Sequence, residues 1–115
     1  MLPKENRLKR RSAFAATYRI GNSFHKDGIT MFLGKEKSDD NPTKYGFVVS
    51  KKIHKRAVKR NRIKRLMRES MRLIIKEKQF ENRYMSVIFV ASSRLLDKDF
   101  SEIDASMKSL AEKLC

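Results

Sequence analysis

One acid-free basic segment contains most of the side chains that could do chemistry. Between Lys51 and Arg68 the chain carries ten lysines and arginines and no aspartate or glutamate. Such groups neutralise phosphates, and arginine adds planar stacking and forked hydrogen bonds. A basic run is often only a solvated helix face, but this one coincides with a net charge of +15 for the whole chain. The segment therefore favours contact with nucleic-acid phosphates.

Three aromatic side chains form a second group of candidates for binding. Phe14 and Tyr18 are four residues apart, which places them on one side of a helix. On this pattern alone, packing in the core is the more common role for such a pair. Phe32 alternates out of phase with the apolar residues of its expected strand, so it points to the opposite face.

The sequence offers little that could catalyse a reaction. His25 and His54 are isolated, and neither a Gly-rich phosphate loop nor a Ser-His-acid arrangement is present. The acid pairs Asp39-Asp40 and Asp97/Asp99 fall in expected loops, where solvation or helix capping is the common role. Cys115 is the only cysteine, so neither an internal disulfide nor a cysteine-rich zinc site is expected. We therefore assign no catalytic residue and no metal ligand to this polypeptide.

The excess of positive charge is confined to the first 82 residues. The chain has 28 lysines and arginines against 13 acids, whereas residues 83–115 carry five of each. A charge density of this kind is normally tolerated because a polyanion neutralises it. No stretch approaches the roughly 20 apolar residues of a membrane span, and the N-terminus MLPKENRLKRR lacks the apolar centre of a signal peptide. We expect an acidic partner, no membrane contact and a cytoplasmic location.

The basic segment is expected on the longest helix of the chain, between Ala57 and Lys78. Apolar residues recur there at helical spacing, from Ile63 to Ile74. Because a helix turns by about 100° per residue, a second set of side chains lies on the arc opposite this apolar stripe and can face a polyanion. These are Asn61, Lys64, Arg65, Arg68 and Arg72, with Arg60 and Arg62 near the two edges of the arc.

Two further helices are expected, one near each end of the chain. Ser12 can cap a short first helix that ends at Gly21. Asp99 or Ser101 can cap the last helix. The apolar face of that helix is Ile103, Met107, Leu110 and Leu114, at intervals of four, three and four.

Strands are expected between these helices. One strand should run from Phe24 to Glu36, with the polar loop KEKSDDNPTK at its end. A second strand or strand pair is expected at 45–50, and a further strand at 85–91, where apolar residues at both parities indicate a central strand. The expected order is helix, strands, helix, strand, helix. In the first strand the residues that should face the core are Ile29, Met31 and Leu33.

The most specific motif in the sequence is the string AVKRNRIKRLMRE. With Arg60-Asn61-Arg62 at its centre and GFVVSKK just upstream, it resembles the signature of the ribonuclease P protein family. The string RLKRRSAFAATYRIG resembles the family's opening basic segment, aromatic first helix and closing glycine. The resemblance runs from about Asn6 to Leu114. One departure is His54, because the family commonly has a glycine there, and a turn with positive φ suits glycine better than histidine.

The resemblance implies an α+β fold, a two-layer α/β sandwich related to the second domain of a small-subunit ribosomal protein. In that fold a strand, the basic helix and a central strand form a left-handed βαβ crossover, whereas general rules of chain handedness favour the right-handed form. The resemblance also implies that residues 1–115 form a single RNA-binding domain of the ribonuclease P protein type.

The resemblance further implies the protein subunit of ribonuclease P, which binds the catalytic RNA subunit and the 5′ leader of precursor tRNA. The protein promotes endonucleolytic removal of the leader. The RNA subunit carries the chemistry and holds most of the Mg²⁺, so no cofactor bound by the protein alone is implied. The implied leader-binding residues are Phe14, Tyr18 and Phe32. We add Asn61 to them, because its side chain both donates and accepts hydrogen bonds and can touch a base edge. The implied basic face for RNA consists of Lys51, Lys52, Arg56, Arg60, Arg62, Lys64, Arg65 and Arg68.

Two other functions would use the same positive charge. A ribosomal or RNA-chaperone protein would bind structured RNA without processing it, and it would not need an exposed aromatic set. A DNA-binding repressor would place the basic helix in the major groove, but no helix-turn-helix pattern precedes Ala57. The aromatic residues are therefore the feature that separates these functions.

Overall fold

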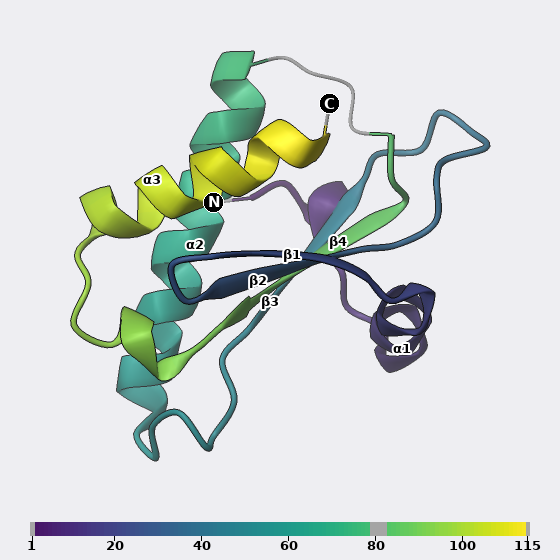
Figure 1. Ribbon diagram of the computed structural model, residues 1–115. Coiled ribbons are helices and arrows are strands. Elements are labelled where there is room, and N and C mark those ends of the chain that lie inside the picture. Colours follow the sequence, from purple (N-terminus) through teal and green to yellow (C-terminus); the bar gives the residue numbers. More distant parts are fainter. Residues whose placement is uncertain (1, 79–82, 115) are drawn as a thin grey trace.

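The computed structural model describes residues 2–78 and 83–114 and combines helices with one four-stranded sheet (Figure 1). The order of the main elements agrees with the order expected from the sequence, and short 3-10 turns lie at 4–6, 93–95 and 112–114. The helices are α1 (Arg11–Ile20), α2 (Ala57–Lys78) and α3 (Phe100–Ala111). The strands are β1 (Asn22–Lys26), β2 (Ile29–Leu33), β3 (Lys44–Val48) and β4 (Ser86–Ala91).

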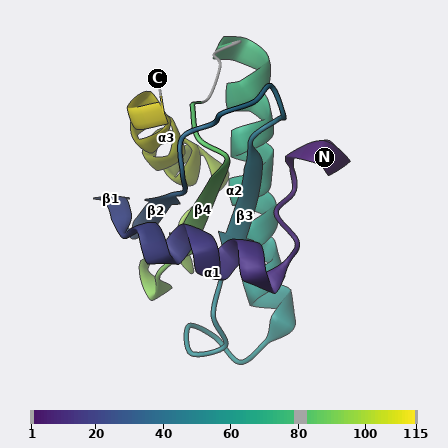
Figure 2. The same cartoon turned by 90° about the vertical axis from the view of Figure 1, so that its right-hand side faces the viewer.

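The sheet has the strand order β1-β2-β4-β3, which confirms β4 as a central strand. β2 pairs antiparallel with both β1 and β4, and β3 pairs parallel with β4. The basic helix α2 is therefore the crossover between two parallel neighbours, and its left-handed sense stays a prediction. α2 and α3 cover one face of the sheet, whereas α1 crosses the opposite face, in front of the strands in Figure 2.

The core lies between the sheet and the layer of α2 and α3. The alternating residues Ile29, Met31 and Leu33 are fully buried there, as the period of the sequence predicts. The stripe of α2 that meets them is equally buried, and this burial fixes which arc of the helix faces outward. Its members are Ile63, Met67, Met71 and Ile74, and α3 adds Ile103, Met107 and Leu110.

The expectation of one strand from Phe24 to Glu36 is wrong, because the chain reverses at Asp27 and Gly28. Both residues have positive φ, 45° and 92°, and β1 and β2 pair antiparallel on either side of them. Asp-Gly is a favoured pair for such tight hairpins, since the turn needs positive φ at both central positions. The turn is therefore encoded locally, by an Asp-Gly pair within the polar stretch 25–28.

The expected cap of α1 is also wrong, whereas the expected end is confirmed. Ser12 lies inside the helix, which begins at Arg11 without a side-chain cap on its N-terminus. The helix ends at Gly21, which is left-handed with φ 74°. In α3, Asp99 is the cap: its carboxylate accepts from the backbone N–H of Glu102 at 3.0 Å, and the Glu102 carboxylate accepts in return from the Asp99 N–H.

Candidate RNA-binding surface

The outward arc of α2 presents the cationic face that the sequence predicts. Asn61 and Arg65 are exposed, and Lys64 and Arg68 are half-buried. Together with Val58 they line a shallow hollow of about 390 Å³. We call these five residues the α2 face. It joins guanidinium and ammonium groups to one amide and one apolar side chain, a combination that can hold phosphates and touch a base or sugar.

Arg60 and Arg62, at the edges of the arc, are tied to the protein itself. The Arg60 guanidinium donates to the backbone carbonyls of His54 and Lys55, at 3.1 and 3.3 Å. Arg62 donates to the carbonyl of Lys98 at 3.1 Å, which connects α2 to the segment before α3. Both arginines are half-buried. They position neighbouring backbone, in addition to any contact with RNA.

The loop before α2 accommodates histidine at the place where the family commonly has glycine. Among the residues that the structure describes, Asp27 is the only non-glycine with positive φ, so His54 is unstrained. Its Nδ1 accepts the backbone N–H of Arg56 at 3.0 Å. The histidine side chain thus holds the loop through a hydrogen bond that a glycine could not make. Lys51, Lys52 and Arg56 lie exposed on this loop.

The three aromatic candidates lie on the face of the sheet that α1 crosses, with Tyr18 and Phe32 in contact and Phe14 over β3. Tyr18 meets Phe32 in a T-shaped contact, with centroids 4.9 Å apart. Tyr18 is 38% exposed, and partial burial raises the pKa of its phenol above the usual 10.0. Phe14 packs against Gly46 of β3, where an added Cβ would lie 2.6 Å from the ring. Phe32 faces α1 rather than the core, as its alternation predicts.

A second hollow, of about 240 Å³, connects this aromatic group to the basic helix. It is lined by Phe14, Gly46, Phe47 and Arg68 and by the N-terminal segment around Leu8. The Arg68 guanidinium carbon lies 6.0 Å from the centroid of the Phe47 ring. Arg68 lines both this hollow and the one along the α2 face. Phe14 and Arg68 thus line one hollow from the two faces of β3, and neither hollow includes Lys51, Lys52 or Arg56.

Several residues that line the two hollows were not among the sites predicted from sequence, and Val58, Arg7, Leu8 and Phe47 are examples. Val58 is 73% exposed, although it is apolar and stands in the first turn of α2. Arg7 and Leu8 reach the site because their segment runs along the edge of β3, with the Leu8 N–H donating to the carbonyl of Tyr45 at 2.9 Å. Phe47 lies under Arg68. Of these residues, only Val58 had a local signal in the sequence, because it is an apolar residue inside a basic run.

The described residues contain no group of three or more histidine, cysteine, aspartate or glutamate side chains that could hold a metal ion. Within the same residues, no helix is both long and apolar enough to cross a membrane. The positive side chains and the aromatic rings are thus the chemical features of this surface.

Comparison with known proteins gives consistent matches. Residues 2–115 match the model of the family described as ribonuclease P. The ribonuclease P protein component of Clostridioides difficile (strain 630) is 38% identical over 106 residues, which cover 92% of this chain and 89% of that protein. That of Clostridium botulinum (strain Loch Maree / Type A3) is 34% identical over 110 residues, covering 96% and 95%. A solved structure of the Staphylococcus aureus RNase P protein superposes with a TM-score of 0.78 at 26% identity, covering 96% of this chain and 95% of that one.

Proposed function

This chain belongs to the ribonuclease P protein family, and on that premise we propose how its surface serves the ribonuclease P ribonucleoprotein. The protein is a component of that particle, with the RNA of ribonuclease P as its partner. The α2 face binds this RNA through phosphates, and the aromatic group binds the single-stranded 5′ leader of precursor tRNA. A ribosomal or RNA-chaperone role is not favoured by the matches, which name ribonuclease P throughout.

The observation that carries the leader proposal is the hollow at the edge of β3 that Phe14 and Arg68 line together. Proteins that bind single strands combine a positive groove, which follows the backbone, with aromatic rings on which successive bases stack. Phe14, Tyr18 and Phe32 supply rings on one side of the sheet, and Arg68 joins them to the cationic helix. A protein that only neutralised phosphates of folded RNA would need the arginine but not the partly exposed rings.

The polypeptide contributes binding and orientation rather than bond cleavage. We assign the cleavage of the phosphodiester to the RNA subunit, which also holds the Mg²⁺. The protein raises the affinity for precursor tRNA, because only the precursor carries a leader. Asn61 is the residue we assign to a sequence preference within the leader, since its amide both donates and accepts hydrogen bonds. We place the particle in the cytoplasm, where tRNA precursors are made.

Reconstitution with the ribonuclease P RNA tests this function directly. The protein, added to the transcribed RNA at low magnesium concentration, should promote cleavage of precursor tRNA at the mature 5′ end. The particle should also bind precursor tRNA more tightly than mature tRNA. A protein that bound the RNA but left both cleavage and this preference unchanged would instead be an RNA-packing protein.

A further inference from the structure

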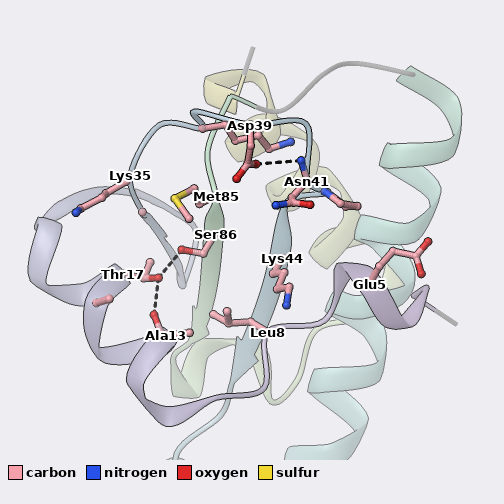
Figure 3. A pocket seen from close by; sticks show the side chains of 14 residues that line it. Glu5, Leu8, Ala13, Thr17, Lys35, Asp39, Asn41, Lys44, Met85 and Ser86 are labelled. Atoms are coloured by element: carbon pink, nitrogen blue, oxygen red, sulfur yellow. Dashed lines mark hydrogen bonds between the residues drawn. The ribbon is translucent and has the colours of Figure 1, made fainter.

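A hollow on the far flank of α1 is not used by the function proposed above. It has a volume of about 730 Å³ and lies between α1 and the segment 34–44 (Figure 3). Its lining includes Leu8, Thr17, Lys35, Asn41, Lys44 and Met85, and we call it the α1 groove. Its size is in the range of small-molecule and nucleotide sites.

The floor of the α1 groove is apolar and its buried hydroxyls are already paired. Leu8 and Met85 provide the apolar surface, and Met85 is 48% exposed. Thr17 Oγ1 donates to the carbonyl of Ala13 at 2.8 Å. Because this uses the single hydroxyl proton of Thr17, Ser86 is the donor in the hydrogen bond between the two hydroxyls. Both hydroxyl protons are used in hydrogen bonds within the protein, so the floor can receive the flat face of a base.

Two lysines flank this floor. Figure 3 shows Lys35 on one side of Met85 and Lys44 on the other. Backbone hydrogen bonds hold them there: the Met85 N–H donates to the carbonyl of Lys35 at 2.8 Å, and the Lys44 N–H donates to the carbonyl of Met85 at 3.1 Å. Within 2–78 and 83–114 neither ammonium group has a carboxylate within salt-bridge distance. Lys35 and Lys44 therefore place a positive charge on either side of the Met85 side chain. The groove is also lined by Lys37 and by the carboxylates of Glu5 and Asp39, so three positive charges face two negative ones.

The α1 groove adjoins the hollow that contains Phe14. Leu8 lines both, and it is the residue at which they meet. An RNA strand with a base on Phe14 could therefore continue past Leu8 into the groove without leaving the protein surface. The side chain of Asn41 at the rim offers a donor and an acceptor to a base edge.

We propose that the α1 groove is a further subsite for single-stranded RNA, which takes leader nucleotides beyond those stacked on the aromatic group. The Leu8 and Met85 surface receives a base, and Lys35 and Lys44 contact the adjoining phosphates. This inference rests on the proposed leader function, because it assumes that a leader already lies on Phe14. It predicts that a longer leader gains affinity from residues that a shorter leader does not touch.

The test uses the reconstituted particle and three RNAs: mature tRNA, a precursor with a short leader, and a precursor whose leader is several nucleotides longer. For the native protein, the long leader should bind more tightly than the short one. The double variant Lys35→Ala/Lys44→Ala should lose this gain and keep the preference for the short-leader precursor over mature tRNA. In a plot of the logarithm of affinity for the long-leader precursor against the logarithm of salt concentration, the slope should become smaller in magnitude by about 0.7 for each lost phosphate contact.

Two matched variants keep this test specific. Lys26→Ala/Lys76→Ala removes the same charge from exposed positions outside the groove, and it should leave the effect of leader length intact. Met85→Glu places a carboxylate on the floor and should abolish the gain from the longer leader, whereas Met85→Leu should keep it. Because Met85 is half exposed, both proteins should fold, which circular dichroism checks.

The outcomes separate this proposal from the function on which it rests. The subsite is absent if the longer leader brings no gain in affinity. It is also absent if the groove variants and the control variant lose equal affinity for all three RNAs. The leader function still stands in that case, provided that the short-leader precursor outcompetes mature tRNA. If the native particle does not distinguish either precursor from mature tRNA, the leader function fails and the subsite with it.

Discussion

The ring of Tyr18 stands edge-on to the ring of Phe32, with centroids 4.9 Å apart and planes inclined by 83°. Such a contact stabilises a protein by about 0.5 to 1.5 kcal/mol beyond the buried area. It also holds both rings in fixed orientations at a place where Tyr18 remains partly exposed. The pair is packed and partly exposed at the same time, so the core role and the proposed binding role of Tyr18 are compatible.

Tyr18→Ala should weaken binding of precursor tRNA by about 1 to 3 kcal/mol if a leader base stacks fully on the ring, and by less if stacking is partial. Binding of mature tRNA should stay nearly constant, because it has no leader. Titration of the reconstituted particle with both RNAs measures the difference. Tyr18→Phe keeps the ring and should bind as the native protein does. Equal losses for both RNAs in a well-folded Tyr18→Ala protein would contradict leader stacking.

Arg65→Ala should weaken binding to the ribonuclease P RNA without destabilising the protein. Arg65 is exposed and is absent from the protein's own hydrogen bonds in the described part of the chain. Each lost phosphate contact lowers the log-log salt slope by about 0.7 to 0.9. Affinity measured at several salt concentrations gives this slope. If the slope stays unchanged, Arg65 is only solvated.

Arg62→Ala should behave differently, because its guanidinium bonds the carbonyl of Lys98. Lys98 in turn donates through its Nζ to the carbonyl of Asp27 in the β1–β2 turn. Losing the first bond should lower the free energy of unfolding by about 1 to 2 kcal/mol. Urea denaturation measures the loss, and Arg62→Lys should recover part of it. Unchanged stability with reduced RNA affinity would assign Arg62 to RNA alone.

The comparison of Arg65 and Arg62 shows where sequence reasoning reached its limit. Periodicity placed α2 at Ala57–Lys78 and chose its outward arc, because burial of one stripe decides the orientation of a helix. It could not assign Arg62 to the carbonyl of Lys98, since that acceptor is 36 residues away and is brought near only by tertiary packing.

The strand region shows a different limit. Alternation identified the buried residues of β2, but the expected strand was begun at Phe24, across the polar stretch 25–28 in which the chain reverses. The Asp-Gly pair is the local signal for the chain reversal, and it should have outweighed the expectation of one continuous strand. The α1 groove, in contrast, left no sequence signal, because α1, β4 and the 34–44 segment are separated along the chain and meet only in the fold.

Glu69→Gln should strengthen binding to RNA. Glu69 pairs with Arg72 at 2.6 Å on α2, and this hydrogen bond holds the pKa of the Glu69 carboxyl below its ordinary 4.5. A lowered pKa means that the pair persists at neutral pH and is lost only as pH falls through the lowered value. Removing the carboxylate frees the Arg72 guanidinium and should steepen the salt slope. A slope equal to the native one would show that Arg72 does not reach the RNA.

Gly46→Ala tests the position of Phe14 without touching its ring. The added Cβ would lie 2.6 Å from Phe14 Cε1 and 2.7 Å from Cζ, closer than such atoms can approach. The ring must therefore move, which costs about 1 to 3 kcal/mol of stability in a packed site. Leader-dependent affinity should fall with it, while affinity for mature tRNA stays nearly constant.

Phe14→Leu combined with Gly46→Ala separates the two effects. The smaller side chain relieves the clash, so thermal melting should return toward that of Phe14→Leu alone. Leader-dependent affinity should stay low, because leucine offers no ring on which a base can stack. Full recovery of leader affinity in the double variant would mean that Phe14 serves only to pack α1 against β3. Loss of stability and of all RNA binding together would indicate the same structural role, since a binding residue should affect only RNA that carries a leader.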